Sequence, residues 1–306
     1  MNALVLGGNG FIGSHVVDNL LKAGHSVRVF DRSPERFRSP LPNVEYRTGL
    51  FGDSFSIAEA LTGVDVVYHL IGTTLPGTSN LNPTADIEDN LIGTVALLQQ
   101  MVKMGVKRII YLSSGGTVYG NPEKNPVTEN HPLRPICSYG IVKVAVENYL
   151  FMFQQHHGIS AIIMRPSNAY GPRQGHTGVQ GIISTFLTKT LAGETLVVWG
   201  DGSITRDYIY VTDLARICLI AGESDVTGVF NVGYSKGYTI STIIETIAKV
   251  VGRKPVVRYE PARYFDVRHI VLDTTKTRMK FDWIPEINLE DGIKKIWEWM
   301  NQIAYR

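Results

Sequence analysis

Two side chains suited to proton transfer, Tyr139 and Lys143, are four residues apart in a stretch that reads as a helix. Residues at this spacing lie on one face of a helix. A tyrosine with a reference pKa of about 10 is a poor base at neutral pH, but a nearby ammonium favours the phenolate. The pair therefore predicts a general base. The competing interpretation is a tyrosine packed on a sheet beside a surface lysine, because a chain with 14 Tyr contains this spacing about once by chance.

A glycine-rich segment near the start of the chain is suited to phosphate binding. Gly7, Gly10 and Gly13 follow an apolar run and open a helical pattern. In this context the glycines allow a tight turn, a close approach of pyrophosphate to the backbone, and packing of the helix on its strand. Glycine-rich turns by themselves usually serve only geometry. Here Asp31 ends a second apolar run about twenty residues on, where a carboxylate can accept bonds from ribose hydroxyls.

These features together predict a dinucleotide site for NAD. The Asp31 carboxylate would repel the 2′-phosphate of NADP, whereas Arg32 beside it leaves NADP as an alternative. A nicotinamide cation near Tyr139 would favour the phenolate further, and it would accept hydride from the carbon whose hydroxyl loses its proton. Lys143 would also bond the nicotinamide ribose.

The composition excludes several classes of protein. The 306 residues are 44% hydrophobic and 19% charged, and the net charge of +2 is too small and scattered for a nucleic-acid or membrane surface. No run of about 18 apolar residues occurs, and no basic segment precedes the first apolar run, so we expect a cytoplasmic protein. Cys137 and Cys218 fit neither a metal-ligand spacing nor a disulfide framework.

Short apolar runs alternate with helical patterns in the first half of the chain, which predicts a parallel sheet covered on both faces. The expected strands are 3–6, 25–30, 44–47, 65–70, 108–112 and 159–165, and the expected helices are 11–23, 56–61, 86–104 and 136–156. The predicted fold class is α/β, a Rossmann-type doubly wound parallel sheet with a smaller α/β substrate-binding lobe. We assign 1–166 to the NAD-binding domain and 167–306 mainly to the substrate lobe, with segments of the two interleaved.

Polar loops follow two of these strands. Gly72 begins a Gly-Thr-Thr loop after one strand, and Ser113, Ser114 and Thr117 lie in the loop after another. The carboxyl ends of parallel strands meet at one edge of a sheet, where cofactors bind. These hydroxyls are therefore well placed for chemistry.

The expected helix 136–156 is apolar nearly all round and must be covered on both sides. One side can face the sheet, and the other predicts a second subunit and hence a homodimer. A C-terminal segment folded over the helix is the alternative.

The motifs together resemble those of the extended short-chain dehydrogenase/reductases. Within that family the chain is most similar to the nucleotide-sugar epimerases of the UDP-galactose 4-epimerase type. The resemblance covers essentially the whole chain. It rests on the ordered segments GGNGFIG from Gly7, Asp31, SSGGTVYG from Ser113, YGIVK from Tyr139 and RPSNAYGP from Arg165.

The resemblance implies NAD as cofactor and a nucleotide-diphosphate hexose as substrate, with a UDP-hexose expected. The implied cofactor contacts are Gly7, Gly10, Phe11, Ile12, Gly13, Asp31, Arg32, Phe51, Leu70, Gly72, Asn90, Ser113, Tyr139, Lys143 and Pro166. The implied substrate contacts are Asn168, Arg206 and Arg263 at the diphosphate, Trp199 stacked on the base and Asp266 at the nucleotide ribose. Two separated arginines suit a diphosphate because each can donate paired bonds.

The chain departs from the family pattern at three positions. Leu50 replaces an Asp that often bonds adenine, which leaves the backbone near Phe51 for that contact, and Thr74 replaces a lysine near the cofactor phosphates. Gly115 stands where the family has a catalytic Ser or Thr. Thr117 is then favoured over Ser114 as the replacement hydroxyl, with direct transfer from the sugar to Tyr139 as the alternative.

The reaction type follows from what is missing after Gly115. Family dehydratases have an Asp-Glu pair there and uronate decarboxylases a Glu, whereas this chain has Gly116 and Thr117, which cannot transfer the required protons. This favours NAD-dependent epimerisation at C4 of UDP-glucose, UDP-galactose or their N-acetylated forms through a 4-keto sugar. Ile270, where some members have Tyr, favours a pocket that admits the N-acetyl group. A net nucleotide-sugar oxidoreductase and a non-catalytic NAD-binding regulator are the alternatives.

Overall fold

Seven strands form one sheet in the order β10-β6-β5-β4-β1-β2-β3, and the pairs from β3 to β6 are parallel. The computed structural model describes residues 1–175, 181–262 and 267–304. The strands of this sheet are β1 (Asn2–Leu6), β2 (Ser26–Asp31), β3 (Val44–Thr48), β4 (Val66–His69), β5 (Arg108–Leu112), β6 (Ser160–Pro166) and β10 (Gly228–Val232). The strand order reverses between β1 and β4, the switch point at which dinucleotides bind in such sheets. This architecture confirms the predicted fold class.

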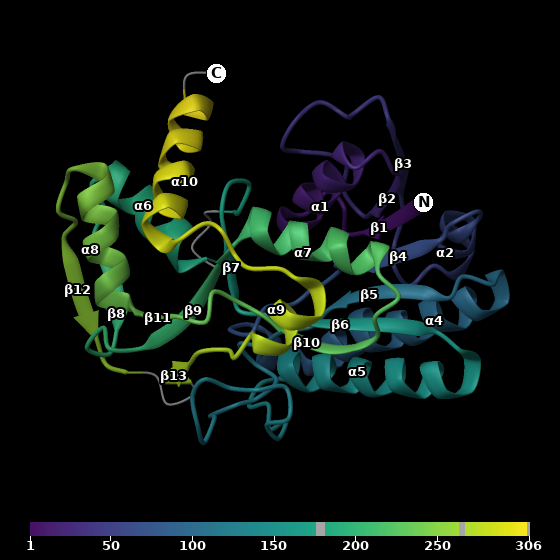
Figure 1. The fold of residues 1–306 in the computed structure, drawn as a ribbon. Coiled ribbons are helices and arrows are strands. Elements are labelled where there is room, and N and C mark those ends of the chain that lie inside the picture. The colour runs from purple at the N-terminus through teal and green to yellow at the C-terminus, as the bar shows by residue number, and fades with distance from the viewer. Residues whose placement is uncertain (176–180, 263–266, 305–306) are drawn as a thin grey trace. The chain divides into compact units, whose positions relative to one another are not determined.

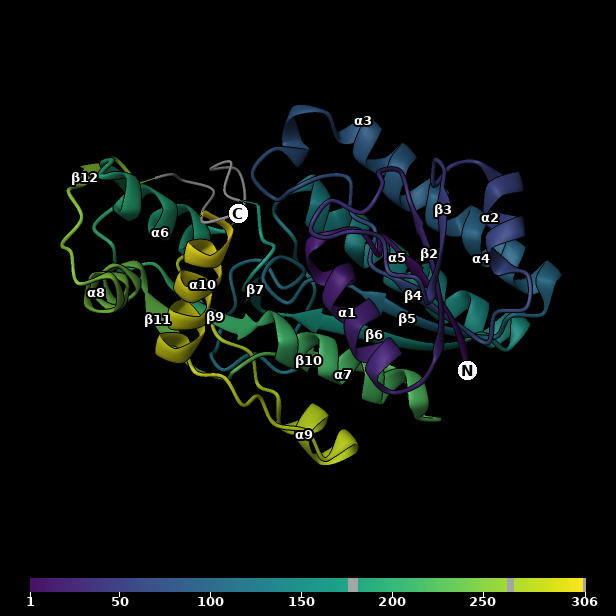
Figure 2. The same ribbon diagram turned by 90° about the horizontal axis from the view of Figure 1, so that it is seen from above.

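Helices cover both faces of the sheet, with α1 and α7 on one side and α2, α4 and α5 on the other (Figures 1 and 2). They are α1 (Phe11–Lys22), α2 (Ser54–Leu61), α4 (Gly93–Met104), α5 (Ser138–His157) and α7 (Val211–Glu223). Alternate strand residues such as Leu4 and Ile109 pack with Leu97 of α4 and Leu150 of α5 in one core. Burial of this apolar surface holds α5 in register with the strand ends.

One expected helix differs from the structure. The stretch predicted as a single helix over 86–104 consists of α3 (Pro83–Asp86), a π-helical stretch η2 (Ile87–Ile92) and α4. The apolar period that predicts a helix does not distinguish a π turn from an α turn. Such wide turns are frequent at functional sites, and this one contains Asn90. A short 3₁₀ turn, η1 (Ser79–Leu81), precedes it.

The chain divides into two compact units with interleaved segments. Unit 1 consists of Met1–Val118, Pro135–Arg165 and Ala215–Phe230, and unit 2 consists of Tyr119–Arg134, Pro166–Leu214 and Asn231–Arg306. Within the described ranges, no helix is both long and apolar enough to cross a membrane.

Unit 2 contains two small sheets and several helices. One sheet joins β7 (Asn168–Tyr170), β9 (Thr205–Tyr210), β11 (Gly237–Thr239) and β13 (His269–Ile270), and the other pairs β8 (Leu196–Trp199) with β12 (Val257–Glu260). The remaining helices are α6 (Ile182–Ala192), α8 (Ile240–Val251), α9 (Thr275–Phe281) and α10 (Leu289–Ala304). Apolar faces of α6, α8 and α10 meet in one core, which contains Leu187, Ile243 and Ile293.

Candidate active site

The loop between β1 and α1 depends on its glycines. Gly7 has a φ of +80° and donates its N–H to the Phe30 carbonyl at 2.9 Å, while Gly10 donates to the Gly7 carbonyl at 3.1 Å. A Cβ on Gly13 would lie only 2.1 Å from the Gly7 carbonyl oxygen, so glycine is needed for α1 to start this close to the loop. The N-cap of α1 forms no side-chain hydrogen bond. Its N-terminal N–H groups and dipole favour an anion here.

Asp31, the last residue of β2, is hydrogen-bonded to this loop. One carboxylate oxygen accepts from the N–H of Asn9 and the other from the N–H of Ser33, both at 3.1 Å. Asn9 Nδ2 donates to the Ser33 carbonyl at 2.7 Å, and within the described ranges Asn9 Oδ1 is buried without a hydrogen-bond partner. A carboxylate has about four acceptor positions, so Asp31 keeps capacity for ribose hydroxyls. Arg32 beside it is exposed.

Asn90 ties the loop after β4 to the π-helical stretch. Its Oδ1 accepts from the N–H of Thr73 at 3.0 Å, and its Nδ2 donates to Thr73 Oγ1 at 2.8 Å and to Asp86 Oδ1 at 3.0 Å. Thr74 Oγ1 also donates to Asp86, at 2.7 Å. Asn90 therefore fixes the shape of the loop that contains Gly72.

An aromatic cluster lies under the strand ends. The ring of Phe51 packs 5.1 Å from that of His69 and lies against Gly93, where an added Cβ would come within 2.7 Å of the ring. Burial and the charge of Lys143 lower the pKa of His69 to about 3, so this imidazole is neutral at physiological pH. Because the Phe51 side chain packs inside the protein, its expected adenine contact falls to its backbone.

The structure brings Tyr139 and Lys143 together in the first two turns of α5. Lys143 is buried and donates from Nζ to the Leu112 carbonyl at the end of β5, at 2.8 Å. Its Nζ also lies 5.5 Å from the ring centroid of Tyr139 and 4.7 Å from that of Tyr111. The one-turn spacing thus places the Lys143 ammonium beside the Tyr139 phenol, and the bond to Leu112 holds the ammonium on the sheet.

Burial strongly affects the protonation of both residues. It raises the pKa of Tyr139 to about 12, while a hydrogen bond with the Ser114 hydroxyl acts to lower that pKa. Burial lowers the pKa of Lys143 to about 8, against the influence of Glu147 and then Asp86, which raise it. Desolvation disfavours the charged form of either group. Deprotonation of Tyr139 therefore requires further positive charge at the site.

The hydroxyls after β5 have different surroundings. The Ser114 hydroxyl is hydrogen-bonded to Tyr139, whereas within the described ranges Thr117 Oγ1 is buried without a hydrogen-bond partner. A Cβ on Gly140 would lie 3.1 Å from the Thr117 carbonyl oxygen, so this glycine lets the loop approach α5. The sequence favoured Thr117 as the hydroxyl that replaces the side chain missing at Gly115, but the geometry places Ser114 against the phenol.

Ser113 takes part in a buried ionic network. Its Oγ donates to Glu147 at 2.5 Å, and Glu147 accepts from Arg165 Nε at 3.0 Å and Nη2 at 2.5 Å. Sequence reasoning placed Ser113 among the cofactor contacts and did not single out Glu147. The signal for Glu147 was its charge inside an otherwise apolar helix, one turn after Lys143.

The predicted cofactor positions of unit 1 lie at the carboxyl ends of strands or in the segments that follow them. Gly7 to Gly13 follow β1 and extend into the first turn of α1, Asp31 ends β2 and Arg32 follows it, Leu70 and Gly72 follow β4, and Ser113 follows β5. Phe51 lies in the loop after β3, Asn90 on η2, and Tyr139 and Lys143 on α5. Pro166 is the last residue of β6.

The predicted substrate contacts belong to unit 2. Asn168 is exposed on β7, and Arg206 lies on the neighbouring strand β9, where its Nη1 donates to the Thr205 carbonyl at 3.0 Å. Trp199 ends β8 and is 39% exposed, and a loop of five residues leads from it to β9. Arg263 and Asp266 lie outside the described residues.

These residues fit a dinucleotide. The glycines leave a cradle that a Cβ would fill, the N-terminus of α1 faces it, and Asp31 adds hydroxyl acceptors at the neighbouring strand end. No group of three or more metal-ligating side chains occurs in the part of the chain that the structure describes.

Comparisons with known proteins agree with this fit. Residues 3–233 match the model of the NAD dependent epimerase/dehydratase family. The chain is 35% identical to a UDP-glucose 4-epimerase of Mycolicibacterium smegmatis, over 96% of this chain and 97% of that one. Among solved structures, it is similar to a Thermotoga maritima UDP-glucose 4-epimerase with UDP-glucose, with a TM-score of 0.94 and 36% identity over 99% of this chain and 100% of that one. It is also similar to a Thermus thermophilus UDP-glucose 4-epimerase with NAD, with a TM-score of 0.92 and 31% identity over 98% of this chain and 99% of that one.

Proposed function

Since the chain belongs to the NAD-dependent epimerase/dehydratase family, we propose that it epimerises a UDP-hexose at C4. The observation that carries the proposal is the group formed by buried Lys143 with half-buried Tyr139 and Ser114 at the end of β5. This group can move a proton at one hydroxyl. The loop offers Gly116 and Thr117 instead of the acidic pair that dehydration needs, which favours oxidation and reduction at a single carbon.

NAD, when bound, supplies a reversible hydride acceptor and positive charge. Tyr139 takes the proton of the sugar O4, with Ser114 orienting the hydroxyl and relaying the proton. Lys143 favours the phenolate by its charge and holds the nicotinamide ribose. Bound NAD would supply reversible hydride acceptance at C4, so that a 4-keto sugar that turned over would be reduced on its other face while Tyr139 returned the proton to O4.

The substrate diphosphate is assigned to Arg206 and Arg263, the base to Trp199, and the nucleotide ribose to Asp266, with Asn168 beside the diphosphate. Paired donors suit phosphate oxygens, and anchoring the diphosphate leaves the sugar free to turn. The proposed substrates include both glucose-type and N-acetylated sugars, because Ile270 is smaller than the tyrosine that narrows the sugar pocket in some members of the family.

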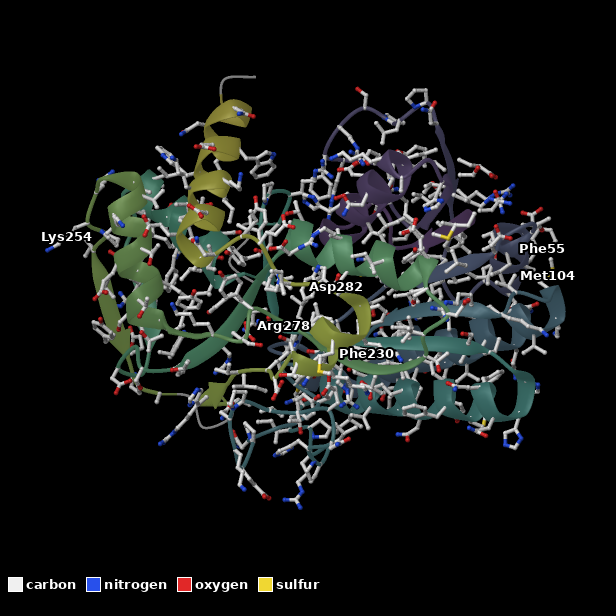
Figure 3. All side chains as sticks on the ribbon, viewed as in Figure 1. Phe55, Met104, Phe230, Lys254, Arg278 and Asp282 are labelled. Atoms are coloured by element: carbon white, nitrogen blue, oxygen red, sulfur yellow. The ribbon has the colours of Figure 1, made fainter. Side chains whose placement is uncertain are left out.

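The working form is proposed to be a cytoplasmic homodimer formed through α5. One side of this helix is buried against the sheet, while Ile141, Tyr149, Phe151 and Met152 are exposed. Ile141 and Met152 are three turns apart and share a face. Met104 at the end of the neighbouring α4 is also exposed (Figure 3). An apolar surface of this kind is typical of obligate interfaces.

Incubation of the purified protein with UDP-glucose, UDP-galactose and their N-acetyl forms, without added cofactor, tests the proposal. Product NMR should show each 4-epimer appearing, while absorbance shows no build-up of NADH, because an epimerase returns its own hydride. Stoichiometric release of NADH with a keto or acid product would instead support a net dehydrogenase. If no sugar is converted although NAD and UDP bind, a non-catalytic role is supported.

A further inference from the structure

Glu147 is a buried carboxylate that neither the sequence motifs nor the proposed chemistry uses. It is 1% exposed, and Arg165, the residue before the end of β6, donates to both of its oxygens. Ser113 adds a third bond at 2.5 Å. Three charge-assisted or short bonds, from β6 and from the loop that follows β5, fix the orientation of this carboxylate.

Two adjacent residues at the end of β5 are bound by two side chains one helical turn apart on α5. Lys143 Nζ donates to the Leu112 carbonyl, and the next residue, Ser113, donates to Glu147. The ammonium and the carboxylate therefore lie on the same face of α5 and against the same strand end. Any movement of Glu147 would disturb the loop that carries Ser114.

The other groups around Lys143 offer little support for its positive charge. The rings of Tyr111 and Tyr139 are neutral while burial keeps their pKa values raised, and burial holds His69 neutral. Apart from Glu147, the anion that affects Lys143 is Asp86, which accepts hydrogen bonds from Ser138, Thr74 and Asn90.

We propose that Glu147 is a positioning residue for the reaction: held by Arg165 and Ser113, it keeps the Lys143 ammonium charged and fixed on the end of β5. The inference rests on the function proposed for Lys143. The charge of Glu147 explains how the buried Lys143 side chain remains a cation near Tyr139. Burial lowers the pKa of Lys143, and of the groups that raise it again, Glu147 has the largest effect.

The variant Glu147→Gln keeps the shape of the side chain and removes its charge. NMR of isotope-labelled lysine side chains, assigned with Lys143→Arg, reads the protonation of Lys143 directly in the protein without substrate. The pKa of Lys143 should fall below its value in the parent protein. Loss of an opposite charge one helical turn away should lower this pKa by about 1 unit, so kcat/KM near pH 8 should drop about 5-fold, with a much smaller loss near pH 6. Glu59→Gln, on the exposed side of α2, should change neither property.

Arg165 would be left without its carboxylate in this variant, which could disturb folding. The double variant Glu147→Leu with Arg165→Met removes both charges and replaces them with apolar volume, which buried ion pairs often tolerate. The double variant should therefore fold. If Glu147 acts on Lys143, the pKa of Lys143 in this variant should again be lower than in the parent protein. A Lys143 pKa equal to that of the parent protein, together with an unchanged pH profile of kcat/KM, in either folded variant would make Glu147 purely structural and overturn the inference. Because NMR reads Lys143 without turnover, this result stands apart from whether the protein is an epimerase.

Discussion

The hydroxyl of Ser114 is hydrogen-bonded to that of Tyr139, and this bond acts against the effect of burial on the phenol. Burial raises the pKa of Tyr139 to about 12, which alone would keep it protonated at neutral pH. A hydroxyl that donates to the phenolate stabilises the charged form. We therefore propose that Ser114, the residue just before Gly115, supplies the hydroxyl that Gly115 lacks at the phenol.

Replacing Ser114 with Ala should lower kcat by about 10²- to 10⁴-fold, the usual loss for a positioned proton-transfer group. The matched variant Thr117→Val keeps the side-chain shape and removes the other candidate hydroxyl. It should have a smaller effect, because Thr117 Oγ1 contacts no hydrogen-bonding group in the described residues. Steady-state assays with the identified sugar measure both. If Thr117→Val is the slower enzyme, Thr117 is the relay, and if both keep the parent kcat, O4 transfers its proton directly to Tyr139.

Replacing Tyr139 with Phe should abolish turnover and leave NAD and UDP affinities nearly unchanged, since only the proton-carrying oxygen is removed. Lys143→Ala should impair both turnover and NAD binding, because the lysine acts on the phenol and on the cofactor. Calorimetric titration and product assays separate the two effects. Near-normal turnover by the Tyr139 variant would remove this residue from the mechanism.

The order of strands and helices in unit 1 could be predicted from the sequence because each element has a clear apolar period and ends at a glycine or a polar loop. The strand Arg108–Leu112 was predicted with its observed bounds. The π turn at Ile87–Ile92 was not, because its pattern of apolar residues is the same as that of an α-helix. Segments of the two units were expected to interleave, but the bounds of those segments depend on contacts between distant parts of the chain, which local patterns do not encode.

For the candidate site, residue spacing and the order of the motifs singled out Tyr139, Lys143 and the glycine loop as candidates. The sequence favoured Thr117 over Ser114, whereas the structure has Ser114 hydrogen-bonded to Tyr139, because the outcome depends on how a loop with two glycines turns. The ionic network of Glu147 and Arg165 was also hidden, since its members are 18 residues apart and meet only through the packing of α5 on β6. The side chains that tune the reactive pair were therefore found only in three dimensions.

A charge introduced on the exposed face of α5 should dissociate the proposed homodimer. The variant Ile141→Glu with Met152→Glu places two carboxylates on one face, where their burial between subunits would be costly. Phe55→Glu is the matched control, because Phe55 is an exposed apolar residue on α2 (Figure 3). Sedimentation velocity should show a dimer for the parent and the control and a monomer for the double variant. A monomeric parent protein would reject the interface.

Replacing Gly13 with Ala should weaken NAD binding and destabilise the fold. The new Cβ would lie 2.1 Å from the Gly7 carbonyl oxygen and 2.8 Å from Gly8 Cα, so α1 must move away from the loop it closes. Overpacking of this kind typically costs about 1–3 kcal/mol, and the displaced helix N-terminus would lose its alignment with the pyrophosphate. Gly77→Ala is the matched control because, apart from its chain neighbours, no atom lies within 4 Å of the Cβ it adds. Thermal unfolding and NAD titration should be altered by the first change and nearly unaltered by the second. Parent-like NAD affinity in Gly13→Ala would mean that the cofactor is held elsewhere than on this loop.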